Sequence, residues 1–173
     1  FSVFLLNEQS IAISQYVANR LASVPHPLRV RLSAIVPFRY GVGIRVNDYD
    51  LSCLNDIEFK VLCTDLIGAA EGVRFERFKP GRDGGVDGRH FSPNGKEWIL
   101  QAKHWTDSLP QLVAHLRSSE AAKVAALQPE RYILVVSHSL TRSNKTAMIE
   151  ALDTTCPVEV YGKEDLNDLL AKH

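Results

Sequence analysis

Two short polar motifs in the middle of the chain carry side chains that suit metal chemistry on a phosphate. The first, at residues 81–88, reads Gly-Arg-Asp-Gly-Gly-Val-Asp-Gly, and the second, at residues 101–103, reads Gln-Ala-Lys. Hard divalent cations such as Mg²⁺ take oxygen ligands, usually one or two carboxylates with several waters. Asp87 can supply the carboxylate, Gln101 a neutral oxygen and Lys103 a fixed positive charge. This set suits metal-assisted phosphodiester hydrolysis, in which the cation activates water and the lysine stabilises the charged phosphate.

A predicted β-hairpin brings the two motifs together. Residues 93–96 read Pro-Asn-Gly-Lys, which is a turn signal because Asn and Gly tolerate positive φ. We therefore expect residues 89–92 and 97–103 to pair as antiparallel strands. The hairpin returns the end of its second strand to the start of its first, where Asp87 lies.

The second strand of the hairpin has two distinct faces, because successive side chains point to opposite sides. One face is apolar and is expected to be core: Trp98, Leu100 and Ala102. The opposite face carries Ile99, Gln101 and Lys103. A carboxylate, an amide and an ammonium group therefore converge on one small patch.

Together the two motifs resemble the Mrr-type branch of the PD-(D/E)XK nucleases. That branch carries Gly-Gly-Ile/Val-Asp and then Gln-x-Lys on the next strand, with glutamine where the superfamily usually has an acid. The resemblance covers residues 49–173 and implies that Asp87, Gln101 and Lys103 are catalytic. It also implies that Asp87, Gln101 and the carbonyl of Ala102 bind Mg²⁺, for which Mn²⁺ can substitute.

The first core helix departs from this pattern. In Mrr-like nucleases it bears Phe-Glu, whose glutamate helps to hold the metal site, whereas here the pair is Phe59-Lys60 and Glu58 precedes it. Two residues along a helix correspond to about 200° of rotation, so Glu58 does not simply take over that direction. Glu58 remains a candidate supporting residue, and the alternative is a favourable acid at a helix start.

Four further residues near the motifs are candidates for supporting or DNA-contacting roles. Asp83 is expected either to cap backbone N–H groups in the turn or to support the metal. His104 is expected to contact DNA or assist proton transfer, or to be a hydrogen-bonded neighbour. Arg82 and Arg89 are candidate DNA contacts, since residues 73–104 carry seven basic and four acidic side chains. A solvated charged surface would show the same excess.

The remaining periodicity predicts alternating helices and strands. We expect a helix from Asn55 or Asp56 to about Leu66, closed by Gly68. Further strands are expected at residues 73–78, 132–137 and 157–161, and further helices at 109–127, 141–152 and 163–172. This order matches the PD-(D/E)XK core. The predicted fold class is α/β, a restriction-endonuclease-like αβββαβ core with a mixed central sheet flanked by helices.

Residues 1–48 form a predicted N-terminal extension that the resemblance does not reach. A helix is expected at residues 7–22 and strands at 28–36 and 40–46. The strands either cap the core as an amphipathic pair or serve dimerisation or DNA contact. The chain therefore divides into this extension and an Mrr-like nuclease domain at residues 49–173.

Composition limits the class of protein. With 173 residues, 45% hydrophobic and 23% charged, and a net charge of +0, the chain is expected to be globular and not a general nucleic-acid coat protein. The three cysteines lack Cys-x-x-Cys spacing, which favours free thiols in a reducing compartment over a zinc site. No run reaches transmembrane length. We therefore expect a cytoplasmic protein with no membrane partner.

The predicted function is a Mg²⁺-dependent endodeoxyribonuclease that cuts double-stranded DNA, in bacterial defence. Cutting both strands needs two sites, which implies a homodimer or a larger assembly. Residues 160–170 also resemble the close of Mrr-like domains that precede STAND-type NTPase modules, and this chain has no phosphate-binding loop of its own. The alternatives are an inactive nucleic-acid-binding module, which Lys60 favours, and a regulatory domain of a larger NTPase protein.

Overall fold

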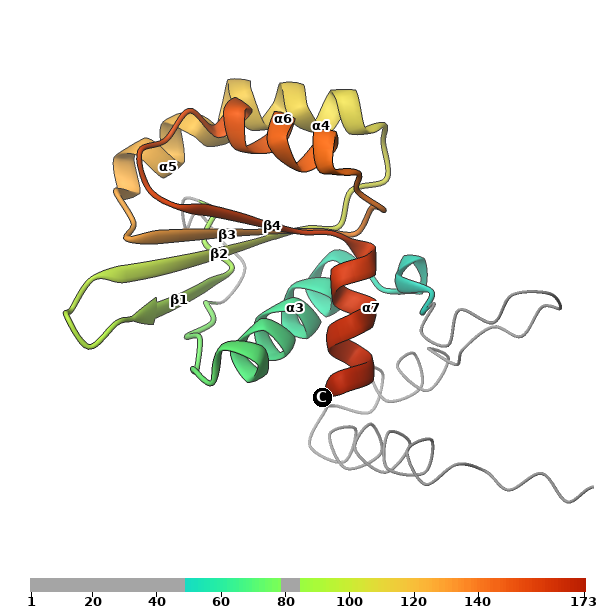
Figure 1. Ribbon diagram of the computed structural model, residues 1–173, viewed down its shortest axis with the longest axis horizontal. Helices are drawn as coiled ribbons and strands as arrows, with labels where there is room; N and C mark the ends of the chain where they lie inside the picture. The colour runs from blue at the N-terminus through green and yellow to red at the C-terminus, as the bar shows by residue number, and fades with distance from the viewer. Residues whose placement is uncertain (1–48, 79–84) are drawn as a thin grey trace, which may run out of the picture.

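The computed structural model describes residues 49–78 and 85–173. The predicted N-terminal extension, Arg82 and Asp83 lie outside the described residues. The described part contains a four-stranded sheet of strand order β1-β2-β3-β4, with helices on both faces (Figure 1). This arrangement confirms the predicted α/β class with a mixed sheet between helices.

The sheet is antiparallel at one edge and parallel elsewhere. Its strands are β1 (Gly88–Phe91), β2 (Glu97–Lys103), β3 (Arg131–Val136) and β4 (Val158–Tyr161). The pair β1–β2 is antiparallel, whereas β2–β3 and β3–β4 are parallel. Parallel neighbours need long crossovers, which here are the helical segments that follow β2 and β3.

The predicted hairpin is confirmed at its turn and in its register. Gly95 has a φ of 73°, and its N–H donates to the carbonyl of Ser92 at 2.8 Å. Gly88 lies opposite Leu100, and the N–H of Asp87 donates to the Leu100 carbonyl at 3.0 Å. The hairpin therefore places Asp87 beside the residues that follow Leu100.

The predicted strand at residues 73–78 was wrong as a full strand of the meander. The segment makes one antiparallel bridge, between Glu76 and Arg89. Phe75 is the buried side chain of this run, while residues 76–78 are exposed. Val73 is partly buried against the same core, so these two side chains give the segment little apolar area with which to extend the pairing.

The first described helix, α3 (Asp56–Glu71), is longer than predicted. Its start is confirmed, since Asn55 caps it and forms a capping box with Glu58. Gly68 does not end it; the helix ends at Gly72, which has a φ of 67°. Gly68 is needed for another reason, because a Cβ there would lie 2.8 Å from the carbonyl oxygen of Val73 as the chain turns back.

The long helix predicted at residues 109–127 has the expected ends and an irregular middle. It consists of α4 (Leu109–His115), a π-helical segment (Leu116–Glu120) and α5 (Ala121–Leu127). The remaining helices are α6 (Arg142–Leu152) and α7 (Lys163–Lys172). Both agree with the sequence prediction, and Thr141 caps α6.

Apolar side chains fill both faces of the sheet. Leu100 and Ala102 pack with Phe59 of α3 and Leu166 of α7 on one face. Ile99 packs beneath the π-helical segment and α6 on the other face. The sequence predicted that only the face with Leu100 and Ala102 would be core. The opposite face is covered by helices as well, and Gln101 on that face is therefore only 2% exposed. Within residues 49–78 and 85–173, no helix is long and apolar enough to cross a membrane.

Candidate active site

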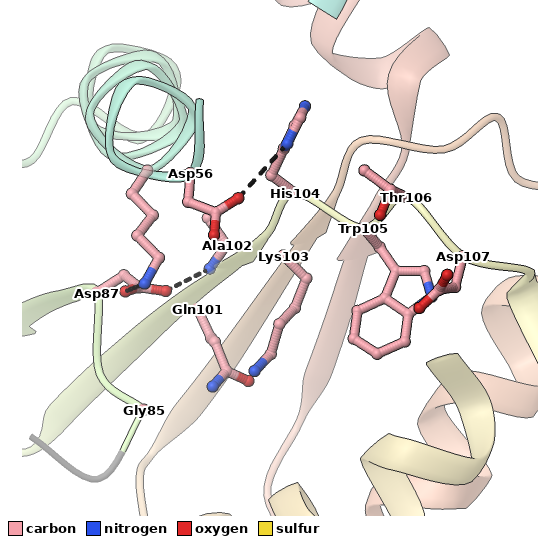
Figure 2. A pocket seen from close by; sticks show the side chains of 11 residues that line it. Asp56, Gly85, Asp87, Gln101, Ala102, Lys103, His104, Trp105, Thr106 and Asp107 are labelled. Carbon is pink, nitrogen blue, oxygen red and sulfur yellow. Dashed lines mark hydrogen bonds and ion pairs between the residues drawn. The ribbon is translucent and has the colours of Figure 1, made fainter. Parts of the chain in front are cut away.

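An open cleft of about 400 Å³ lies at the carboxyl end of β2. It is lined by residues of α3, the loop before β1, the end of β2 and the loop that follows: Asp56, Lys60, Gly85, Asp87, Gln101, Ala102, Lys103, His104, Trp105, Thr106 and Asp107 (Figure 2). The structure thus brings together all the residues that the two motifs nominated as catalytic or metal-binding. The hairpin is what unites them, as the sequence predicted.

Asp87 is held by both of its carboxylate oxygens. Oδ2 accepts the backbone N–H of Ala102 at 2.9 Å, a bond across the hairpin that fixes the side chain (Figure 2). Oδ1 lies 2.9 Å from the ammonium of Lys60. The Asp87 side chain is 10% exposed, whereas the Lys60 side chain is 45% exposed. Asp87 therefore presents one anchored oxygen and one oxygen that already faces a cation.

The buried side chain of Gln101 forms hydrogen bonds with Tyr132 and Glu120. Its Oε1 accepts the hydroxyl of Tyr132 at 2.6 Å, and its Nε2 donates to Oε2 of Glu120 at 2.9 Å. Burial raises the pKa of Tyr132, and the charges of Glu120 and Asp87 raise it further, so the phenol keeps its proton and donates. Because a carboxylate can only accept, the amide oxygen of Gln101 must face Tyr132.

Lys103 ends β2 with its ammonium 2.9 Å from Oε1 of Glu120. The same oxygen lies 3.1 Å from Nζ of Lys123 and 3.1 Å from Nε2 of His115. Glu120 is 1% exposed, although it closes the π-helical segment. One buried carboxylate therefore gathers the Gln101 amide and the Lys103 ammonium on the face that the motifs defined.

Sequence reasoning missed Glu120, although the chain contains a signal for it. Leu116, Glu120 and Val124 follow one another at i, i+4 spacing, and the two apolar members are buried. A carboxylate within an apolar stripe needs compensating partners. The same spacing also describes an exposed acid beside a stripe, so the pattern alone does not distinguish the two.

The partners of Glu120 control its ionisation. Burial raises the pKa of this carboxyl, but hydrogen bonds from Gln101 and Lys103, with the Lys103 charge, outweigh burial and lower the pKa to about 2. Glu120 is therefore an anion across the physiological range.

Gly85, in the loop before β1, allows the backbone to lie against this cluster. Its φ is +85°, and a Cβ at this position would lie 2.6 Å from Nε2 of Gln101 and 3.2 Å from Oε2 of Glu120. The second glycine of the Gly-Gly pair is thus required by both conformation and space.

Two other nominated residues lie away from the cleft lining. The carboxylate of Glu58 accepts the N–H of Asn55 at 2.8 Å, which supports the alternative of an acid at a helix start. Arg89 lies 3.0 Å from the Glu76 carboxylate and 3.5 Å from that of Glu97. Neither residue joins the catalytic group in this arrangement.

Comparison with known proteins agrees with this geometry. Residues 52–170 match the model of Mrr_cat, described as a restriction endonuclease family. The chain belongs to the Mrr_cat family. It is also similar to "Uncharacterized protein y4cD" of Sinorhizobium fredii (strain NBRC 101917 / NGR234), with 41% identity over 128 residues, 72% of this chain and 20% of that protein. The chain therefore spans about a fifth of that relative's length.

The Mrr_cat domain offers a divalent cation few protein ligands. Within the described residues, no group of three His, Cys, Asp or Glu side chains could hold a metal ion. The Gln101 oxygen is engaged by Tyr132, and Glu120 by four nitrogen donors. Asp87 remains as the mostly buried carboxylate of the cleft, with an oxygen 2.9 Å from the Lys60 ammonium. Asp56 and Asp107 add two exposed carboxylates to the lining. Such a sparse set fits Mg²⁺ held mainly by water and substrate phosphate.

His104 and Trp105 of the Mrr_cat domain lie on the cleft but are tied to the protein. Nε2 of His104 is 3.3 Å from the carbonyl of Leu51, and Nδ1 is 3.6 Å from the Asp56 carboxylate (Figure 2). These contacts support the interpretation of His104 as a hydrogen-bonded neighbour. Trp105 is partly buried and packs against the apolar side chains on the Ile99 face of the sheet, and its Nε1 donates to the Ser108 carbonyl at 3.3 Å.

Proposed function

We propose that this domain is a metal-dependent DNA endonuclease that hydrolyses phosphodiester bonds in its cleft. The observation that carries the proposal is the convergence of Asp87, Gln101 and Lys103 on one cleft of a domain whose family is one of restriction endonucleases. An anchored carboxylate can hold a metal ion, and a fixed ammonium can stabilise charge on the phosphate, so the pair suits hydrolysis of a phosphate diester.

The proposed division of labour follows from the contacts. Asp87 would hold the cation through Oδ1, since Oδ2 is occupied by the Ala102 N–H. When bound, a divalent cation would supply Lewis-acid stabilisation of the phosphate and a water of lowered pKa. Mg²⁺ is proposed, with Mn²⁺ as a substitute. Lys103 would place its charge beside the phosphate, and Lys60 would add a second charge at the open side of the cleft.

The resemblance suggests two further metal ligands, the amide oxygen of Gln101 and the carbonyl oxygen of Ala102, but the contacts described above do not by themselves support either one. Gln101 would have to release the Tyr132 hydroxyl to turn its oxygen to the cation. The carbonyl of Ala102 is proposed as a metal ligand because of the resemblance. Asp87 is therefore the ligand on which the experiment concentrates.

The proposed biological setting extends the family membership. Restriction endonucleases cut double-stranded DNA, so we propose that substrate, a role in bacterial defence, and a homodimer or larger assembly that supplies two sites. A linked NTPase module is also proposed, and the greater length of the relative leaves room for one. Cytoplasmic location is proposed because all three cysteines, each within the described residues, are free thiols.

The test is plasmid cleavage by the purified chain with Mg²⁺ or Mn²⁺, with and without EDTA. Asp87→Ala and Lys103→Ala should abolish cutting. Asp65→Ala and Lys145→Ala are the matched controls, because both residues form ion pairs away from the cleft lining. Cutting that survives EDTA, or survives both cleft variants, would contradict the proposal.

A second candidate function is a DNA-binding module without catalysis. The Lys60–Asp87 pair favours it, because an ammonium already lies against the carboxylate that is proposed to hold the metal. Salt-sensitive DNA binding with no metal-dependent cutting by the folded wild-type chain would establish this alternative.

A further inference from the structure

Glu120 joins the two strand residues of the proposed site from outside both motifs. Its Oε2 accepts Nε2 of Gln101 at 2.9 Å, and its Oε1 accepts Nζ of Lys103 at 2.9 Å. Both oxygens therefore act on β2, one on each of two residues whose side chains share a face. A buried carboxylate that is held at both oxygens keeps one orientation. It also restrains the Gln101 and Lys103 groups that are bound to it.

The π-helical segment places Glu120 against the sheet. Its widened turn is closed by the N–H of Ala121, which donates to the carbonyl of Leu116. One extra residue in the turn shifts the direction of later side chains by about 100° relative to a regular helix. Leu116 before Glu120 and Val124 after it are both buried, so the segment keeps its apolar contact while turning a carboxylate inward.

A second lysine and a histidine also contact Glu120 beside Lys103. Nζ of Lys123 and Nε2 of His115 each lie 3.1 Å from the Glu120 oxygen that Lys103 contacts. The negative charge of Glu120 thus faces the two permanent positive charges of Lys103 and Lys123, and these three groups together have a net positive charge. Lys103, with 20% of its side chain exposed, is positioned at the cleft without being neutralised.

We propose that Glu120 is the positioning residue of the site: it fixes the Lys103 ammonium and the Gln101 amide where the phosphate binds. This inference rests on the proposed nuclease function and assigns that function a residue outside both motifs. Glu120 acts through Lys103 and Gln101 and does not itself touch the substrate.

Chemical labelling tests the positioning without relying on cleavage. Wild type and Glu120→Gln are treated with an amine-reactive acetylating reagent, and labelling rates are measured per lysine by mass spectrometry. Lys103 should label several-fold faster in the variant, because its ammonium loses the carboxylate partner. Lys145, which pairs with Asp165 at 2.6 Å, is the internal control and should keep its rate.

Cleavage kinetics then test the consequence. Glu120→Gln should lower kcat by about 10- to 100-fold with little change in KM, since a displaced group loses transition-state contact. Adding Glu120→Gln to Lys103→Ala should cost little more, because residues that act as a unit are non-additive. Glu71→Gln, which removes a carboxylate 2.8 Å from Arg131, is the matched control with unchanged kcat.

The outcomes separate this inference from the function on which it rests. Unchanged Lys103 labelling, wild-type kcat in Glu120→Gln, or fully additive losses would overturn the positioning role. If the wild type does not cut DNA while Lys103 labelling rises, the nuclease proposal fails and the Glu120 contacts remain established. If Glu120→Gln does not fold, Glu120→Asp, which keeps the charge but is one methylene shorter, should show the same direction of change in labelling and kcat.

Discussion

The pair between Lys60 and Asp87 is the feature that most distinguishes this site at the scale of residues. Lys60 stands on α3 where the resemblance leads one to expect an acid, and its ammonium lies 2.9 Å from the Asp87 carboxylate. A permanent cation at that oxygen competes with a metal ion for the same charge. On the proposed function, Lys60 would therefore weaken metal binding by Asp87 without removing this ligand.

Lys60→Met should strengthen Mn²⁺ binding to the DNA-free protein. A half-exposed ion pair is worth up to about 1 kcal/mol, so the Kd should fall by up to about fivefold. Isothermal titration calorimetry measures this Kd, and Lys145→Met is the matched control with no expected effect. Equal or weaker Mn²⁺ binding by Lys60→Met would show that the lysine does not compete.

The ionisation of Glu120 gives a stability prediction with a defined sign. The folded pKa of Glu120, about 2, lies below the ordinary value of 4.5. The contribution of the ionised carboxyl to the free energy of unfolding is therefore complete above pH 4.5 and is lost as the pH falls toward 2. The shift corresponds to about 3 kcal/mol of unfolding free energy. Urea denaturation from pH 6 to pH 3 should show a steeper loss for wild type than for Glu120→Gln, and parallel curves would contradict this.

At the scale of elements, the sequence predicts the hairpin better than the helix after it. The Asn-Gly turn and the alternation in β2 determine which side chains share a face, and the structure agrees. The π-helical segment has no comparable local signal, since its residues are ordinary helix formers. Its last residue, Glu120, is ion-paired with Lys103, 17 positions earlier, and accepts a hydrogen bond from Gln101, 19 positions earlier, so local sequence does not reveal these partners.

Gly85→Ala tests how closely the loop before β1 packs on that cluster. A residue with positive φ other than glycine costs about 1 kcal/mol or more, and the contact with Gln101 should add about 2 kcal/mol. Gly72→Ala is the matched control, because Gly72 has a φ of +67° and nothing within 4 Å of the added Cβ. Chemical denaturation should therefore show a larger loss for Gly85→Ala, and equal losses would contradict the close packing.

At the scale of the whole molecule, the sequence indicates the class and the order of elements but not how the sheet is enclosed. Alternation in β2 suggested one buried face, whereas helices cover both, so Gln101 became an interior residue. The short bridge at Glu76 was likewise predicted as a full strand, because alternation does not reveal how many of its side chains find a partner. Both differences depend on contacts between distant elements.

The most direct test of the nuclease proposal is single-turnover cleavage of an end-labelled DNA duplex by wild type and Lys103→Ala. Protein in excess with Mg²⁺ isolates the chemical step from product release, and DNA affinity is measured in parallel with Ca²⁺ in place of Mg²⁺. We expect Lys103→Ala to cut at least about 100-fold more slowly while binding DNA with similar affinity. Equal cleavage rates for the two proteins would contradict a nuclease site at the end of β2.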